Sequence, residues 1–479
     1  MDLEGYAAHL IQNEENDVQL KLKEKIIELK KCCGQDEADI LAAAILEETK
    51  SALFVKGDVF EYQKSGASMG EFGIGSRGAG DFYVHEKIGK VIGKTTAVLD
   101  SSNMDDSGVV ALAGGTNSGG TNSGGTNSDG ANSGSADGAD SPDYLVVTVD
   151  GMHSRLSAFP FLSGFHVAKA ALRDIYVMGA KPAAMLSDIH VADDGDAAMI
   201  FDHLAGISAV AELSGIPLVT GSTLRIGGDM VIGKRMTGCV GAVGAVNAGS
   251  LTARNNAKSG DLILMTEGTG GGTVTTAAIY SGYEKAAEVV EKTLNIDFLI
   301  AVQALLDSKE KLHTQIHVMT DVTNGGVRGD AYEISKEANI RLVFDDGALV
   351  QCVEPTVLEM FEKLEIDFRG VSIDSLLVIC PPEIAENVIQ TVNGAGVKMF
   401  VVGRVEEKQT GKFDTALMID GAEKEFKPMF REAAYTPIKK VIGERTPPDF
   451  EEMKKGIDAA ADSAIEKKER IVKRIQNRK

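Results

Sequence analysis

Apolar residues in the middle of the chain recur with two alternating periods. Runs such as YLVVTV (144–149) are short and rich in β-branched residues, which predicts strands. FHVAKAALRDIYVMGAKP (165–182) and DAAMIFDHLAGISAVAELSG (196–215) instead carry apolar residues at three-and-four spacing, which predicts helices. A second set of strands and helices begins at DLILMTEGTGGG (261–272). The repetition predicts two domains that each mix helix and sheet.

Polar and glycine-rich segments divide the chain further. AGSLTARNNAK (248–258) marks the boundary between the two domains. The expected parts are a helical N-terminal extension, a first domain, a second domain and a helical C-terminal tail, over residues 1–94, 95–255, 256–425 and 426–479. Helix is expected through residue 65, and TTAVLD (95–100) predicts a short strand.

Residues 114–142 have a composition unlike the rest of the chain. They repeat TNSGG and contain no apolar residue beyond alanine. Such a sequence cannot contribute to a hydrophobic core. We expect a flexible loop inserted between two strands, VVALA (109–113) and YLVVTV.

Two apolar runs end in an aspartate. LVVTV reads as a strand buried on both faces and leads into Asp150, and HVMTDVTNGGVRGD (317–330) places Asp321 in the same way. A carboxylate at the end of a buried strand needs a partner, because burying it alone costs several kcal/mol or a large pKa shift. A lysine, a helix N-terminus or a metal ion would each serve.

Three more carboxylates lie close to predicted elements. Asp105 and Asp106 precede VVALA, where they either cap a turn or bind a ligand, and Asp174 lies inside a predicted helix. Magnesium takes hard oxygen ligands, often one or two carboxylates completed by phosphate oxygens and water. Scattered aspartates near strand ends therefore suit a metal–polyphosphate site.

The glycine-rich loop at 66–80 contains FGIGSRG (72–78), which matches GxGxxG. The residues before it are polar rather than strand-forming, so a dinucleotide site is disfavoured. A loop that folds over phosphates fits better, with Lys64, Gly75, Arg77 and Gly78 as nucleotide-binding candidates.

His153 and Arg155 follow Asp150 at the strand exit and are the catalytic candidates, although a lone histidine is as often structural. The five cysteines are scattered, without a CxxC, and we interpret them as buried or incidental thiols.

Charge and hydropathy narrow the class of protein. The 479 residues carry 70 acidic and 49 basic side chains, a formal charge of −21, which argues against a nucleic-acid-binding protein. No run approaches the ~18 apolar residues of a membrane span. The acidic N-terminus lacks the features of a signal peptide. We expect a cytoplasmic protein.

Four of these segments resemble the motifs of one family. MDDSGVV (104–110) resembles a GDDAAV segment, TVDGMHSR (148–155) a strand-end aspartate motif, ALRDIYVMGAKP (171–182) an LSDLAAMGA helix, and MTDVTNGGVRGD (319–330) a DVSDGL motif. Their order and spacing over residues 95–425 are similar to those of the aminoimidazole ribonucleotide (AIR) synthetase-like superfamily. Its members include thiamine-monophosphate kinase, selenophosphate synthetase and HypE. The sequence resembles in particular the synthase-related proteins of methanogenic archaea.

The resemblance implies an α+β fold in which an N-terminal α/β ATP-binding domain precedes a C-terminal α+β domain. It also implies a homodimer formed through the first domain, and ATP whose phosphates Mg²⁺ bridges to aspartates. Thr323 and Gly325 join the nucleotide-binding candidates. The metal-ligand candidates are Asp105, Asp106, Asp150, Asp174 and Asp321.

The sequence departs from each named activity. Ser222 stands where thiamine-monophosphate kinase has a metal-binding aspartate, with Asp229 as a substitute, and Asn324 replaces a second aspartate. The glycine loop lacks the cysteine or selenocysteine of selenophosphate synthetases. HypE ends in a reactive cysteine, whereas this sequence ends in QNRK.

Three functions stay open. One is an ATP- and Mg²⁺-dependent enzyme that phosphorylates or activates an unidentified small-molecule or protein acceptor. The others are a HypE-like maturation factor and a nucleotide-binding regulator with reduced catalysis.

Overall fold

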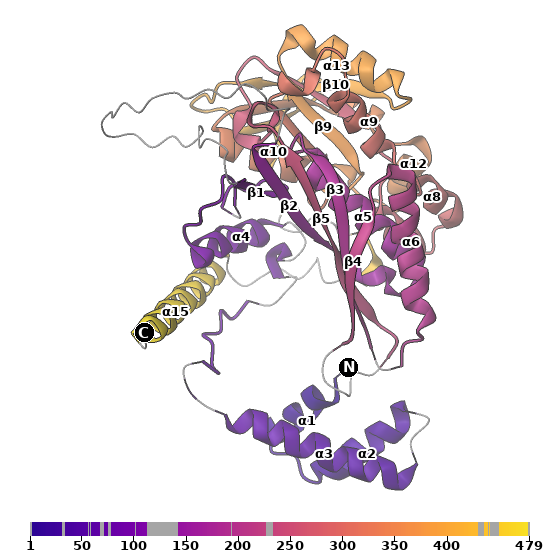
Figure 1. The fold of residues 1–479 in the computed structure, drawn as a ribbon, viewed down its shortest axis with the longest axis vertical. Helices are drawn as coiled ribbons and strands as arrows, with labels where there is room; N and C mark the ends of the chain where they lie inside the picture. Colours follow the sequence, from indigo (N-terminus) through magenta and orange to yellow (C-terminus); the bar gives the residue numbers. More distant parts are fainter. Residues whose placement is uncertain are drawn as a thin grey trace, which may run out of the picture.

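The computed structural model describes most of the chain. The described residues are 2–477 without 31–33, 56, 58, 68–70, 75–77, 101, 113–141, 193, 227–232, 430–434, 439 and 441–449. Figure 1 shows two sheets with their helices, a helical unit near the N-terminus and a long helix near the C-terminus. The prediction for the TNSGG segment lies outside the described residues.

The N-terminal extension contains a three-helix unit with a core of its own. Helices α1 (Leu3–Gln12), α2 (Val18–Leu29) and α3 (Gln35–Phe54) pack around small and aliphatic side chains such as Leu22, Ile26 and Ala42. This unit lies at one end of the molecule, apart from both sheets (Figure 1). The helical pattern stops at Phe54, so the prediction of helix to residue 65 is wrong for its last residues.

The first sheet has five strands in the order β1-β2-β5-β3-β4. These are β1 (Gly108–Ala111), β2 (Tyr144–Gly151), β3 (Lys181–Val191), β4 (Leu218–Arg225) and β5 (Met236–Val246). Only β3 and β4 pair in parallel. The prediction of a strand at 95–100 is wrong, because the backbone there makes hydrogen bonds with Val109 through Val98 and Leu99 but forms only an isolated bridge.

Two helices, α5 (Pro160–Tyr176) and α6 (Ala198–Ser214), cover one face of this sheet. They cross closely because glycines lie at the contact. A Cβ on Gly164 would lie 2.0 Å from the carbonyl oxygen of His203, and one on Gly206 would lie 2.2 Å from that of Phe161. Helix α5 is buried on almost every side, and Asp174 near its C-terminus is half-buried.

Among the described residues, no helix covers the opposite face of the first sheet. Val149 of β2 is 66% exposed and Val147 is 36% exposed, whereas Val146 on the other face is fully buried. The prediction that this strand is buried on both faces is therefore wrong for its C-terminal half.

The second sheet has seven strands in the order β12-β11-β8-β10-β6-β9-β7. They are β6 (Leu262–Thr266), β7 (Val318–Val322), β8 (Arg341–Asp345), β9 (Ser375–Cys380), β10 (Met399–Glu406), β11 (Thr415–Ile419) and β12 (Ala422–Glu425). Both faces of the middle strands are covered. Leu376 and Val378 of β9 join one hydrophobic core, while Leu377 and Ile379 join another, as the two-residue period of a strand requires.

In the part of the chain that the structure describes, seven α-helices accompany the second sheet. They are α7 (Gly272–Tyr280), α8 (Ala286–Thr293), α9 (Asp297–Leu306), α10 (Gly326–Ala338), α11 (Asp346–Gln351), α12 (Pro355–Lys363) and α13 (Pro382–Gly394). Helix α9 shares one core with α5 of the first domain. That shared core fixes the two domains against each other.

The remaining helices pack on each other. Met453 and Ile457 of α15 (Phe450–Gln476) contact the segment that leads into α4 (Ala79–Ile92), and the Tyr83 hydroxyl of α4 donates to Asp458 at 2.8 Å. Among the described helices, none combines the length and the apolar character needed to cross a membrane.

Candidate functional site

A cavity of about 590 Å³ is lined by residues of both domains. It lies where β2 and β7 end and where α5 passes between them. The predicted metal ligands all line it, together with His153, Arg155 and Thr323: these ligands are Asp105, Asp106, Asp150, Asp174 and Asp321. The structure thus brings together carboxylates that lie more than 200 residues apart in the sequence.

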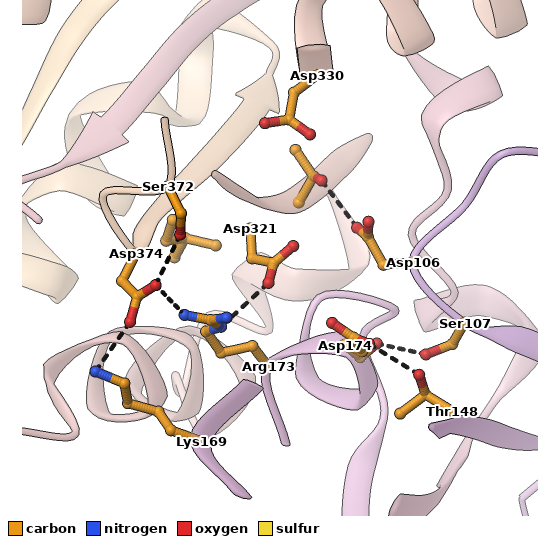
Figure 2. A network of polar contacts seen from close by, with 12 residues as sticks. Asp106, Ser107, Thr148, Lys169, Arg173, Asp174, Asp321, Asp330, Ser372 and Asp374 are labelled. Atoms are coloured by element: carbon orange, nitrogen blue, oxygen red, sulfur yellow. Dashed lines mark hydrogen bonds and ion pairs between the residues drawn. The ribbon is translucent and has the colours of Figure 1, made fainter. Parts of the chain in front are cut away.

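Four of these carboxylates, which we call the carboxylate cluster, are Asp105, Asp150, Asp174 and Asp321. Burial raises the pKa of Asp174 well above its ordinary value, and the negative charges of Asp321 and Asp150 raise it further. Burial also raises the pKa of Asp105 and of Asp321 to about 7. Thr148 donates to Asp174 at 2.8 Å, as Figure 2 shows. Carboxylates that repel one another in this way favour a bound cation.

A second group, which we call the ion-pair cluster, is Lys169, Arg173 and Asp374, of which Arg173 and Asp374 line the same cavity. Asp374 lies 3.0 Å from Lys169 Nζ and 2.5 Å from an Arg173 nitrogen (Figure 2). Burial opposes ionisation of Asp374, but the two cations outweigh it and hold its pKa well below the usual range. Asp374 also has a φ of +54°, a conformation that is unfavourable for a non-glycine residue and persists only where the surrounding contacts stabilise it.

Arg173 links the two clusters. Its Nε lies 3.1 Å from Asp321, so the guanidinium contacts one carboxylate of each cluster (Figure 2). Burial disfavours its charge, but Asp374 and Asp321 raise its pKa above the ordinary value. Asp321 still has a raised pKa, because burial and the neighbouring Asp106 and Asp150 outweigh this single ion pair.

Asp106 has a different environment from the carboxylate cluster. Arg254, which is 2% exposed, approaches it at 2.7 Å and also contacts Asp330 and Glu333 at 3.2 Å each. Thr320 donates to the other oxygen of Asp106 at 2.8 Å. Asp106 therefore stabilises the junction between the domains as well as lining the cavity.

His153 and Arg155 lie on the segment that leaves β2 and enters the short helix η2 (Ser154–Ala158). The imidazole of His153 contacts Tyr435 Oη at 2.8 Å through Nε2 and Thr276 Oγ1 at 3.2 Å through Nδ1. Burial raises the pKa of Tyr435 to about 12, so this phenol stays protonated. Arg155 stacks on Tyr280, 4.0 Å from the ring centre.

Glycines let the backbone approach these side chains. A Cβ on Gly271 would lie 2.5 Å from Asp374 Oδ2, and one on Gly272 would lie 3.3 Å from His153 Cβ. Gly325 and Gly326 both have positive φ, and a Cβ on Gly326 would lie 2.3 Å from the Arg369 carbonyl oxygen. Gly325 precedes α10 and turns the chain after Thr323, which lines the cavity.

The other nucleotide-binding candidates do not reach this cavity or lie outside the described residues. Lys64 and Gly78 are described and do not line it. Gly75, Arg77 and the proposed substitute Asp229 lie outside the described residues. Ser222 lies within β4, opposite Asp188 of β3.

Sequence reasoning missed several residues that line or support the cavity: His166, Lys169, Arg173, Asp374 and Tyr435. One signal was available for the first three, because a predicted helix that carries His, Lys and Arg among small apolar residues needs acidic partners. Asp374 and Tyr435 carry no comparable local signal.

The carboxylate oxygens of the cavity suit a magnesium ion whose coordination is completed by phosphate. Asp105, Asp150, Asp174 and Asp321 supply hard carboxylate oxygens, the ligands that Mg²⁺ prefers. Among the described residues, no three His, Cys, Asp or Glu side chains lie close enough to hold a metal by themselves. Mg²⁺ commonly takes one or two carboxylates and completes its shell with phosphate oxygens and water.

Comparison with known proteins decides the family. Residues 135–246 match the family described as AIR synthase related protein, N-terminal domain, and residues 258–415 match its C-terminal domain. The Uncharacterized protein MJ1416 of Methanocaldococcus jannaschii is 47% identical over 491 residues, which cover 100% of this chain and 99% of that protein. The chain belongs to the AIR synthase-related family. The resemblance found in its motifs is confirmed.

More distant relatives have named activities. Selenide, water dikinase of Myxococcus xanthus is 26% identical over 282 residues, 53% of this chain and 76% of that protein. The thiamine-monophosphate kinase of Pyrococcus horikoshii is 24% identical over 270 residues, 55% of this chain and 79% of that protein. These relatives support a coarse assignment as an enzyme with ATP-binding kin.

The solved structures confirm the predicted fold class. The hydrogenase maturation protein HypE in complex with ATP aligns with a TM-score of 0.53 at 18% identity, over 62% of this chain and 88% of that chain. At this identity the similarity shows the shared two-domain α+β architecture.

Proposed function

We propose that this protein is an ATP- and Mg²⁺-dependent enzyme that transfers a phosphoryl group to an acceptor or uses ATP to activate it. The observation that carries the proposal is the convergence of four carboxylates, from both domains, on one cavity. Burial raises the pKa of Asp105, Asp174 and Asp321, so their charged forms are disfavoured unless a cation compensates them, which supports a metal at this cavity. Kinship with ATP-binding enzymes supports the same assignment.

Each group has a distinct role in this proposal. Asp150, Asp174, Asp321 and Asp105 would hold Mg²⁺ ions with one or two carboxylates to each ion, and the bound metal would offset the charge on the phosphates and orient the γ-phosphoryl group. The ion-pair cluster keeps Arg173 beside Asp321 and so fixes the geometry of the carboxylates. His153 would take a proton from the acceptor once the acceptor replaces Tyr435 at Nε2, with Thr276 still in contact with Nδ1.

We also propose that the protein acts as a homodimer in the cytoplasm. The uncovered face of the first sheet supports the dimer, because Val149, Leu186 and Leu224 are 66%, 38% and 56% exposed there. Leu186 lies over Gly241 of β5, next to the row of Val149. An apolar face of this kind is typical of a protein–protein interface.

Thermal unfolding tests the nucleotide site. ATP with Mg²⁺ should raise the melting temperature more than ATP with EDTA, because a ligand that binds only the folded state stabilises it. Asp150→Asn should lose this increment while it remains folded. Asp307→Asn, an exposed carboxylate paired with Lys181, is the matched control and should keep it. An unchanged increment in Asp150→Asn would reject the carboxylate cluster as the metal site.

Turnover distinguishes the remaining alternatives. ATP hydrolysis that rises with one member of a metabolite panel supports a small-molecule enzyme. Hydrolysis that rises only with a copurified protein supports a HypE-like maturation factor. Binding of Mg²⁺ and ATP without turnover under either condition supports a regulator, which the loss of aspartates at Ser222 and Asn324 would allow.

A further inference from the structure

A second cavity of about 430 Å³ adjoins the acidic one and has the opposite charge. Its charged lining side chains are Arg155, Lys234 and Arg235, and the described residues that line it include no carboxylate. We call it the cationic groove. Its walls are otherwise small or apolar: Ser154, Ser157, Ala158, Pro160, Met199 and Tyr280.

The groove is an exception to the charge of the molecule. The chain has a formal charge of −21, so three cations without a lining carboxylate form a local reversal. Lys234 and Arg235 are exposed and make no ion pair with the described residues. Ionised side chains that point into a concave site without a partner favour an anionic ligand.

The groove and the acidic cavity adjoin each other. Ser154 and Arg155 line both of them. The segment that leaves β2 therefore passes Asp150 in the carboxylate cluster, His153 and then Arg155 at the groove. A ligand anchored at Arg155 would extend toward His153, the residue to which we assign proton transfer.

The side chains of the groove walls also indicate the chemical character of the uncharged part of the ligand. Arg155 stacks on the Tyr280 ring at 4.0 Å, so one wall of the groove is built from a guanidinium and an aromatic ring in contact. Pro160 and Met199 complete an apolar wall. An arginine fork binds planar or tetrahedral oxyanions through two parallel hydrogen bonds.

We propose that the cationic groove binds the phosphate of the acceptor, which is then a small organic phosphate with an apolar or aromatic body. This rests on the proposed function, because it places the acceptor opposite the nucleotide. Three cations match a phosphate dianion better than a carboxylate with one charge. The nucleotide phosphates stay at the carboxylate cluster, where Mg²⁺ compensates their charge.

Phenyl phosphate is the probe for this proposal, with benzoate and inorganic phosphate as comparisons. Titration calorimetry should show that phenyl phosphate binds more tightly than either. The double variant Lys234→Ala, Arg235→Ala should weaken phenyl phosphate binding about tenfold or more, since each charge-assisted hydrogen bond contributes more than the 1.4 kcal/mol of one tenfold step. Lys398→Ala, Arg404→Ala changes the net charge equally at exposed sites of the second domain and should bind as wild type does.

Mg²⁺ and ATP separate this proposal from the function on which it rests. The groove variant should lose phenyl phosphate and retain Mg²⁺-dependent ATP binding, whereas Asp150→Asn should do the reverse. Unchanged phenyl phosphate binding in the groove variant overturns the acceptor site. Parallel loss of ATP would show that the groove holds the nucleotide phosphates, which also overturns it. Tighter binding of benzoate would overturn the assignment to a phosphate.

Discussion

Two charged clusters share one cavity and behave oppositely. In the ion-pair cluster, Asp374 is buried, yet two cations hold its pKa well below the ordinary value. In the carboxylate cluster, burial and like charges raise the pKa of Asp174 well above it. Burial is common to both, so the partner decides the direction of the shift. The balanced cluster is a structural element, and the unbalanced one is suited to a ligand that supplies positive charge.

The largest loss of stability is expected from removing the carboxylate of the ion-pair cluster. Asp374→Asn leaves Lys169 and Arg173 buried with less compensation, which should destabilise the fold by about 3–5 kcal/mol. Denaturation by urea at pH 7 measures the loss. Asp307→Asn removes an exposed pair with Lys181 and should cost only about 0–1 kcal/mol. Equal losses in the two variants would show that the buried cluster has no special structural role.

The dependence of stability on pH tests the surroundings of the ion-pair cluster. His166 lies against it, and burial followed by the charge of Lys169 lowers the pKa of its imidazole to about 3, although Asp374 acts the other way. The unfolded state therefore binds this proton first, and stability falls as the pH drops from about 6.5 toward 3. His166→Gln should remove about 2 kcal/mol of this loss between about pH 6.5 and 4.5.

Denaturation of wild type and His166→Gln at several pH values gives the comparison. The Thr275 hydroxyl lies 3.0 Å from the His166 ring, so the substitution also changes this contact and the absolute stability. The comparison therefore uses the slope of the unfolding free energy against pH. Identical slopes would mean that the imidazole is not kept neutral by its surroundings.

A smaller effect, a gain in stability, is expected from removing a charge of the carboxylate cluster. Asp174→Asn removes a carboxylate that Asp150 and Asp321 repel, and Thr148 can still donate to the amide oxygen. Without metal at pH 8, the variant should be more stable than wild type by about 1 kcal/mol. It should also lose the stabilisation that Mg²⁺ and ATP provide. A variant that is less stable in EDTA would show that the carboxylate is held by favourable contacts instead.

Sequence reasoning located Asp150 and Asp321 because they follow a rule of chain geometry, whereas Asp105 and Asp174 were assigned as ligands through the motifs of the family. Asp150 and Asp321 end apolar strands, and strand ends of two domains met at one cavity. No such rule of chain geometry applies to the ion-pair cluster. Asp374 precedes a strand, and its pairing with Lys169 depends on how α5 packs against the second domain. That packing is a property of the whole fold.

The strands show a similar limit. The apolar runs of β2 and β9 look alike in the sequence, but β9 has a hydrophobic core on each side, whereas the outer face of β2 is uncovered. An apolar run reports which residues avoid water and not whether a helix or a second subunit covers them. Tyr435 illustrates the same point, because its contact with His153 joins positions 282 residues apart.

Electron paramagnetic resonance with Mn²⁺ in place of Mg²⁺ tests the central claim most directly. The signal reports how much Mn²⁺ the protein binds when a non-hydrolysable ATP analogue is present. Wild type should bind Mn²⁺ together with the nucleotide, and Asp150→Asn should weaken that binding on the order of tenfold or more. Asp307→Asn should match wild type. Equal Mn²⁺ binding by Asp150→Asn and wild type would contradict the assignment of the carboxylate cluster as the metal–nucleotide site.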